Sequence, residues 1–96
     1  MKPDRPHEII KVLGKTFVFA NDLNPITKEW DLHIYLRHLV LAEEAIAAFF
    51  NITEQIYNIK YDRYEAYSQE DNMYVYYFYY KNNKNIIMII TAFKKD

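Results

Sequence analysis

Two strand-forming segments near the C-terminus, joined by an asparagine-rich turn, constrain this fold more than any other feature. Residues 73–81 are almost wholly aromatic, and residues 86–93 are apolar at nearly every position, as is typical of a central strand. Between them lies the sequence Lys-Asn-Asn-Lys-Asn at 81–85, and asparagine tolerates the left-handed backbone that a tight turn needs. The sequence therefore predicts an antiparallel hairpin.

Alternating residues just before this hairpin extend the same sheet. Residues 55–61 alternate with the period of two that indicates a half-buried strand. Residues 63–69 continue the alternation after a turn near Asp62. With the hairpin, these two segments predict a four-stranded antiparallel meander.

A helix is predicted before the meander. Thr27 and Asp31 are its candidate N-caps, and it should run to about Phe50, with Asn51 as a stop. Residues 39–41 leave open a break into two shorter helices. We therefore expect an α+β domain in which an N-terminal helical segment packs on a four-stranded or larger antiparallel sheet.

The first third of the chain is less regular. Residues 1–7 carry two prolines among charged residues, which predicts an irregular, poorly ordered lead-in. Residues 8–13 and 15–20 are short β-rich runs on either side of Gly14. They fit a hairpin, although residues 8–13 fit a helical turn equally well.

Length and composition exclude several classes of protein. Ninety-six residues make one domain, residues 1–96, and the absence of cysteine excludes a disulfide framework or a thiolate zinc site. The longest apolar run is far too short for a membrane span, and no signal peptide is visible, so we expect a soluble cytoplasmic protein without membrane attachment. The net charge of −1 argues against nucleic-acid binding over the whole surface, so a polyanion would need a local patch.

Titratable groups are concentrated in one stretch of the predicted helix. His33 and Arg37 lie one helical turn apart on one face, and Glu44 would join them if the helix continued unbroken. His38 points away from both. The five-residue spacing of the two histidines does not suit a shared metal ion, and with a single glycine no phosphate-binding glycine loop can be written. We expect no cofactor and no metal.

These groups fit RNA cleavage without a metal, which needs a base, an acid and donors to the phosphate. His33 suits proton transfer, because imidazole titrates near neutral pH. Arg37 offers a planar fork of donors for phosphate oxygens, and Thr91 could donate its hydroxyl to the same phosphate. Tyr67 could donate a proton or stack on a base, and His38 is a further candidate.

Three short motifs carry a resemblance to a known family. They are Trp30, His33, Ile34, Arg37 and His38 on the helix, Glu65-Ala66-Tyr67-Ser68 in the sheet, and Ile90-Thr91-Ala92-Phe93 on the last strand. At this spacing the chain resembles the small ribonuclease toxins of the barnase, EndoU, colicin ribonuclease and RelE-like superfamily. The family's usual tyrosine pair is Ala66-Tyr67 here. A looser likeness to BrnT-like toxins covers residues 37–45.

The resemblance implies a RelE/barnase-like fold and a catalytic site assembled from the helix and the last strand, with His33, Arg37 and Thr91 as members. It implies a metal-independent endoribonuclease toxin that cuts tRNA or mRNA by transesterification and leaves a 2′,3′-cyclic phosphate. A neutralising antitoxin or immunity protein is the expected partner. The sequence leaves open whether the protein forms a homodimer.

Each candidate residue also has a structural explanation. A histidine on an apolar helix is more often a packed structural residue, and the tyrosines of residues 74–80 more often form sheet core than a base-stacking surface. Thr91 could simply be a β-branched packing residue. The alternative function is a non-catalytic interaction module, such as a phage-encoded inhibitor or an antitoxin-like binder, that docks on a protein through its aromatic sheet face. The near-neutral charge favours that alternative.

Overall fold

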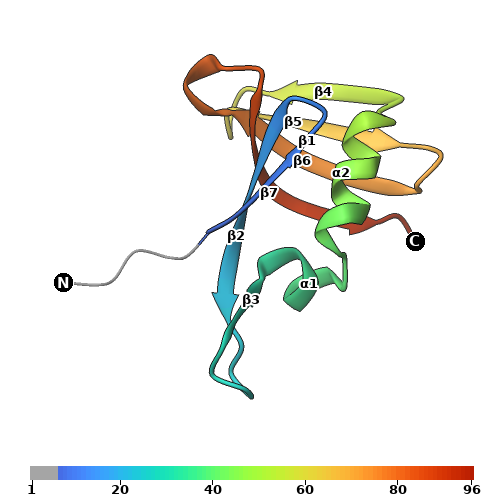
Figure 1. Ribbon diagram of the computed structural model, residues 1–96. Coiled ribbons are helices and arrows are strands. Elements are labelled where there is room, and N and C mark those ends of the chain that lie inside the picture. Colours follow the sequence, from blue (N-terminus) through green and yellow to red (C-terminus); the bar gives the residue numbers. More distant parts are fainter. Residues whose placement is uncertain (1–6) are drawn as a thin grey trace.

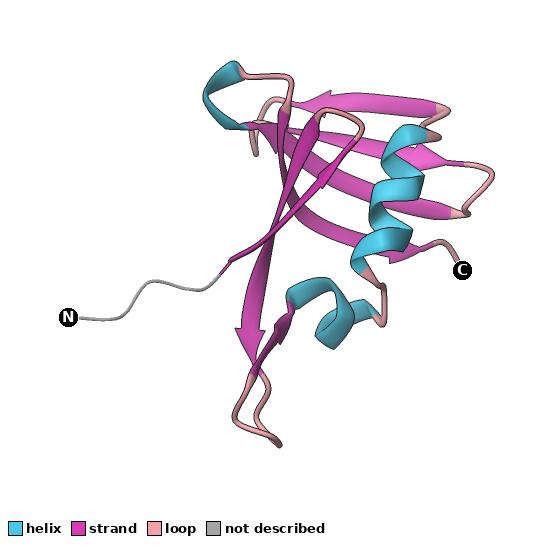
Figure 2. Ribbon diagram, viewed as in Figure 1, coloured by secondary structure: helices cyan, strands magenta, loops and turns pink. Residues whose placement is uncertain are grey.

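The protein is a mostly β domain in which seven strands form one mixed sheet with two helices beside it (Figures 1 and 2). The computed structural model describes residues 7–96, so the predicted irregular lead-in lies outside the described residues apart from His7, which begins the first strand. The elements are β1 (His7–Val12), β2 (Lys15–Leu23), β3 (Trp30–Leu32), α1 (His33–His38), α2 (Ala42–Phe50), β4 (Glu54–Asn58), β5 (Arg63–Ser68), β6 (Met73–Tyr79), the short 3-10 helix η1 (Tyr80–Asn82) and β7 (Ile86–Lys94).

The sheet has the spatial order β1-β2-β7-β6-β5-β4, and β3 pairs with the far end of β2. Strands β4 to β7 pair antiparallel with their chain neighbours. On its other side, β7 pairs in parallel with β2, from Thr16 opposite Ile86 to Phe19 opposite Ile89. This arrangement makes β7 a central strand, which explains why its sequence is apolar on both faces.

The predicted fold is wrong in two respects. The helices follow three strands instead of leading the chain, and the sheet of seven strands, which agrees with the expected four or more, is mixed instead of antiparallel throughout. The RelE/barnase-like arrangement is therefore not what this chain adopts. The parallel pairing of β2 and β7 produced the error, because strands so far apart in sequence share no turn whose residues would reveal the pairing.

The helical region is broken where the sequence left a break open. Leu39 adopts a left-handed backbone with φ 57° and ends α1, and α2 begins at Ala42. The predicted helix start at Thr27 or Asp31 is wrong, because residues 30–32 form β3 and pair with the end of β2. Glu44 accepts a hydrogen bond of 3.0 Å from the Leu41 amide and so caps α2, instead of extending the line of His33 and Arg37.

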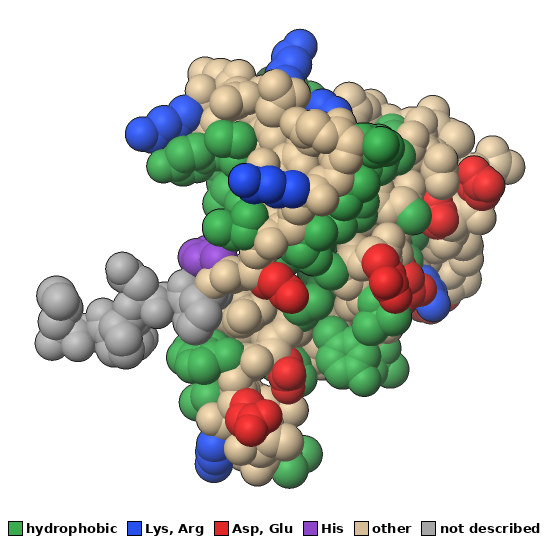
Figure 3. Space-filling model, in the orientation of Figure 1, with side chains coloured by type: hydrophobic (Ala, Val, Ile, Leu, Met, Phe, Trp, Pro, Cys, Tyr) green, Lys and Arg blue, Asp and Glu red, His purple; other side chains and the backbone are tan. Residues whose placement is uncertain are grey.

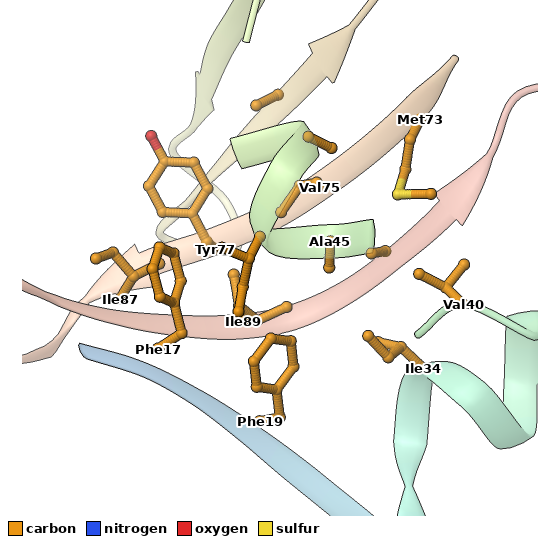
Figure 4. Packing of buried hydrophobic residues seen from close by; sticks show 14 residues of the cluster. Phe17, Phe19, Ile34, Val40, Ala45, Met73, Val75, Tyr77, Ile87 and Ile89 are labelled. Atoms are coloured by element: carbon orange, nitrogen blue, oxygen red, sulfur yellow. The ribbon is translucent and has the colours of Figure 1, made fainter. Parts of the chain in front are cut away.

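The hydrophobic core lies between the sheet and the helices (Figure 4). Phe17 and Ile87 are completely buried, and Tyr77 is 2% exposed. Phe49 of α2 packs edge-on against both Phe17 and Tyr77, with ring centroids 5.2 Å and 5.1 Å away. Each such side chain contributes about 1.5–3 kcal/mol on burial, so this face fixes the position of α2.

Charges of both signs are spread over the surface. In Figure 3, basic side chains gather at the end near η1 and the β1–β2 turn, while acidic side chains lie on α2 and the loop between β2 and β3. No broad single-sign surface is visible from this side, in agreement with the net charge of −1. Neither helix of the described residues has the length or apolar character that a membrane crossing requires.

Candidate functional site

The face of the sheet turned away from α2, here called the open face, carries two rows of side chains that run across neighbouring strands. Residues directly opposite each other point to the same side, so the pairing registers define the rows. The first row is Ile56, Glu65, Tyr76 and Thr91, and the second is Glu54, Tyr67, Tyr74 and Phe93. Two of the predicted site residues, Tyr67 and Thr91, therefore share this face.

His33 and Arg37 meet at the carboxylate of Asp22, near the end of β2. The Nδ1 atom of His33 lies 2.5 Å from Asp22 Oδ2, and the Nε atom of Arg37 lies 3.8 Å from the same oxygen. This meeting is possible because β3 pairs with the end of β2 and α1 follows it at once. The His33 side chain is 26% exposed and that of Arg37 is 68% exposed, so both can meet a ligand from solvent.

The Asp22 carboxylate determines how the His33 ring can work. With Nδ1–H donating to Asp22, the lone pair of the neutral ring is on Nε2. An aspartate in this position fixes both the tautomer and the orientation of the ring. Sequence reasoning missed Asp22, although a carboxylate eleven residues before His33 was a signal that the sequence offered.

His38 lies at the end of the second row. Its ring centroid is 5.6 Å from that of Phe93. Partial desolvation, together with the charges of His33 and Arg37, lowers the pKa of His38 below its ordinary value of 6.5. The ring is therefore mostly neutral at pH 7 and can accept a proton.

Aromatic rings continue from His38 across the sheet. Phe93 stacks on Tyr74 with centroids 5.2 Å apart, and Tyr74 contacts Tyr67 at 4.8 Å. The Tyr67 hydroxyl donates to Asn72 Oδ1 at 3.0 Å, so its proton is already engaged within the protein. Of the two roles expected for Tyr67, stacking on a base therefore fits its surroundings better than donating a proton.

Thr91 occupies the first row beside Tyr76, but its hydroxyl is covered. The Oγ1 atom is buried, and it has no hydrogen-bond partner among the described residues. A hollow of about 360 Å³ beside α1 is lined by Asp22, Leu23, Pro25, Leu36 and Arg37, without Thr91. That Thr91 binds the same phosphate as His33 and Arg37 stays a prediction.

Two further points concern residues considered from the sequence. Glu44 forms an ion pair of 3.4 Å with Lys94 as well as capping α2, which leaves Asp22 as the carboxylate at His33. Among residues 7–96, no three side chains of histidine, cysteine, aspartate or glutamate come together as a metal ion would require. The groups that meet at the site are the imidazole of His33, the guanidinium of Arg37 and the carboxylate of Asp22.

No protein-family model, no curated protein and no solved structure matches this chain.

Proposed function

We propose that the protein is a metal-independent endoribonuclease that cleaves RNA by transesterification. The observation that carries the proposal is the grouping on α1, where His33 and Arg37 meet Asp22 and His38 lies at the end of the aromatic row. Two imidazoles and one guanidinium on six consecutive residues meet the requirements of such a reaction for a base, an acid and a phosphate ligand.

The two histidines suit different proton transfers. His38, with its lowered pKa, fits the base that takes the proton from the 2′-hydroxyl. The 2′-oxygen then attacks phosphorus and the bond to the 5′-oxygen breaks. His33 fits the acid, because a protonated ring can hold Nδ1–H on Asp22 while Nε2–H protonates the departing oxygen. The products are a 2′,3′-cyclic phosphate and a 5′-hydroxyl.

Arg37 fits the group that holds the phosphate. Its guanidinium is largely exposed, and only Nε is directed to Asp22, at 3.8 Å. The remaining donors can bind two phosphate oxygens in parallel and stabilise the charge that develops on them. Because the net charge is only −1, this local cation matters more than any general attraction of RNA.

The row formed by Phe93, Tyr74 and Tyr67 fits the binding of unpaired bases next to the cut. Stacking on aromatic side chains is the usual way in which proteins hold single-stranded RNA. A tRNA loop or an mRNA is the substrate proposed, which places the protein in the cytoplasm. If the enzyme acts as a toxin, a neutralising partner protein goes with the proposal.

The test is cleavage of total RNA by the purified protein in excess EDTA. We expect His33→Ala to lower the rate by about 100-fold or more, the range typical for loss of a positioned acid or base. His7→Ala is the matched control, since His7 lies on β1 in a different hollow, and it should retain full activity. Activity that disappears with the chelator, or that persists in His33→Ala, would contradict the proposal.

A second function is favoured by the apolar side chains at the β4 edge. Ile56 is 65% exposed and Tyr57 is 46% exposed on the outermost strand, which fits a non-catalytic module that docks on a protein. Expression in a host without a partner separates the two functions. Growth arrest that depends on His33 supports the ribonuclease, whereas normal growth together with no RNA cleavage supports the docking module.

A further inference from the structure

A hollow on the open face, away from α1, is built around one carboxylate. This Glu65 hollow has a volume of about 230 Å³, and its lining residues are Glu54, Gln55, Ile56, Glu65, Tyr67, Tyr74 and Tyr76. The Glu65 side chain is only 17% exposed, which is unusual for a charged group. Its position therefore depends on the polar partners around it.

Three donors hold one oxygen of this carboxylate. Glu65 Oε2 accepts hydrogen bonds from Arg63 Nε at 2.9 Å and from Asn58 Nδ2 at 3.0 Å, and Arg63 Nη2 lies 2.9 Å away. Arg63 is fixed in turn by the face of the Tyr76 ring, 4.7 Å from its guanidinium carbon. All these contacts are to Oε2, so Oε1 remains as an oriented acceptor for a ligand in the hollow.

The surroundings favour a neutral ligand with a flat ring. The charge of Glu65 is balanced by Arg63, and a second cation is already close by, since the Lys95 ammonium lies 5.2 Å from the centre of the Tyr67 ring that lines the hollow. A further cation therefore gains little in this hollow. Burial and the nearby Glu65 raise the pKa of Tyr76, so its hydroxyl stays protonated, and the tyrosine rings offer faces and edges for stacking.

Among the four RNA bases, guanine matches a carboxylate acceptor best. Its Watson–Crick edge presents two neighbouring donors, the N1–H and the N2 amino group, and the two lone pairs of Oε1 can accept from both. Adenine and cytosine each place a ring acceptor beside their amino donor, and uracil has one donor between two acceptors. A carboxylate repels those acceptors, so it distinguishes guanine from the other three bases.

We propose that the Glu65 hollow is a guanine-binding subsite, in which Glu65 accepts the hydrogen bonds of the base edge and a tyrosine ring stacks on the base. The proposal rests on the ribonuclease function and makes the cut selective for sites near an unpaired guanosine. The aromatic row links the hollow to α1, because Tyr67 and Tyr74 line the hollow and Phe93 contacts His38.

The first measurement uses the unmodified protein and nucleoside 5′-monophosphates in a calorimetric or NMR titration. Guanosine monophosphate should bind about tenfold or more tightly than the adenosine, cytidine and uridine monophosphates, because the wrong bases leave a buried acceptor unpaired. Inosine monophosphate lacks the N2 amino group, so its affinity should lie between that of guanosine monophosphate and those of the other three nucleotides. Equal affinity for all five, or equal affinity for guanosine and inosine, would overturn the proposal.

The second measurement uses Glu65→Gln, which keeps the shape of the side chain. It should remove the preference for guanosine while weak binding of every nucleotide remains. Glu43→Gln is the matched control, because Glu43 is an exposed glutamate on α2 outside the Glu65 hollow, and it should keep the preference. N-acetyl-arginine amide is the competing probe. If N-acetyl-arginine amide binds more tightly than guanosine monophosphate, the hollow is a site for a peptide, and the proposal of a guanine subsite is overturned.

These titrations separate the subsite from the cleavage reaction. Selective binding of guanosine monophosphate without any RNA cleavage would support the guanine subsite and contradict the proposed ribonuclease function. Cleavage that depends on His33, without any preference among the nucleotides in binding, would support the ribonuclease function and contradict the guanine subsite.

Discussion

The two faces of the sheet carry the same kinds of side chain but keep them in different surroundings. On the face under α2, Phe49 contacts both Phe17 and Tyr77 edge-on, and the two strand residues are buried almost completely. On the open face, Tyr74 and Phe93 also stack, but each remains partly accessible. The aromatic composition therefore says little about function; the side of the strand on which a ring falls decides its role.

The two faces also differ in the polar groups that they hold. Ser68 is the only buried polar residue between the described ends of the chain, and its hydroxyl donates to Asp71 at 2.7 Å. The open face instead holds Arg63 and Glu65 in a hydrogen-bonded pair within the sheet. Keeping charged groups half-buried costs desolvation energy and does not by itself stabilise a fold. The position of Arg63 and Glu65 on the open face is what a binding surface requires.

The largest expected effect is on stability, and it should differ between variants of the two faces. Phe17→Ala should lower the free energy of unfolding by about 3–5 kcal/mol, because it leaves a cavity among rings that cannot close over it. Phe93→Ala on the open face should cost less stability, since the ring is partly exposed, yet it should weaken RNA binding. Chemical denaturation and an RNA-binding titration on both variants measure this. Equal losses of stability would mean that the open face is core as well.

Local pairing explains what the sequence predicted correctly. The β1–β2 hairpin turns at Leu13 and Gly14, both with positive φ, and Gly14 marked that turn in the sequence. The later turn also uses positive φ, at Lys81 and Asn82 inside the asparagine-rich segment. The break near Leu39 and the stop at Asn51 are confirmed too. In every case the residues that decide the structure are neighbours in the chain.

Distant pairing explains what was missed. An apolar run on both faces of β7 indicates a strand with neighbours on both sides, yet the predicted meander gave it only β6. The second neighbour, β2, is separated from it by the whole helical region. The partner of His33 was missed for the same reason, because Asp22 reaches it only after β3 has folded back onto β2. Helical periodicity had directed attention to Glu44 instead.

A smaller effect tests whether cleavage at the α1 site depends on the orientation of the His33 ring. Asp22→Asn should lower RNA cleavage by up to about 100-fold, because an amide can hold His33 in the wrong tautomer. The free energy of unfolding should fall by only about 1 kcal/mol, the value of one hydrogen bond. The rate of cleavage and the unfolding curve are measured on the same preparation.

Asp31→Asn is the matched control for this change, since Asp31 pairs with Asp22 across the strands but bonds to Asn24. It should leave the rate of cleavage unchanged. Full activity in Asp22→Asn would mean that the aspartate only supports the fold, and His33 would then lose its assigned role.

The smallest expected effect is a shift in the pKa of His38. The positive charge of Arg37 helps to lower this pKa, so Arg37→Gln should raise it toward the ordinary value of 6.5. At a given pH near neutrality, less of the ring is then neutral, and the acidic limb of the cleavage rate should move to higher pH. NMR titration of the imidazole protons follows the pKa directly, even where cleavage is slow. Lys60→Gln, an exposed cation in the turn after β4, is the control and should leave the pKa in place. A His38 pKa that stays constant or falls in Arg37→Gln would show that the two side chains do not share one electrostatic environment, and the proposed base would lose its link to the phosphate-binding group.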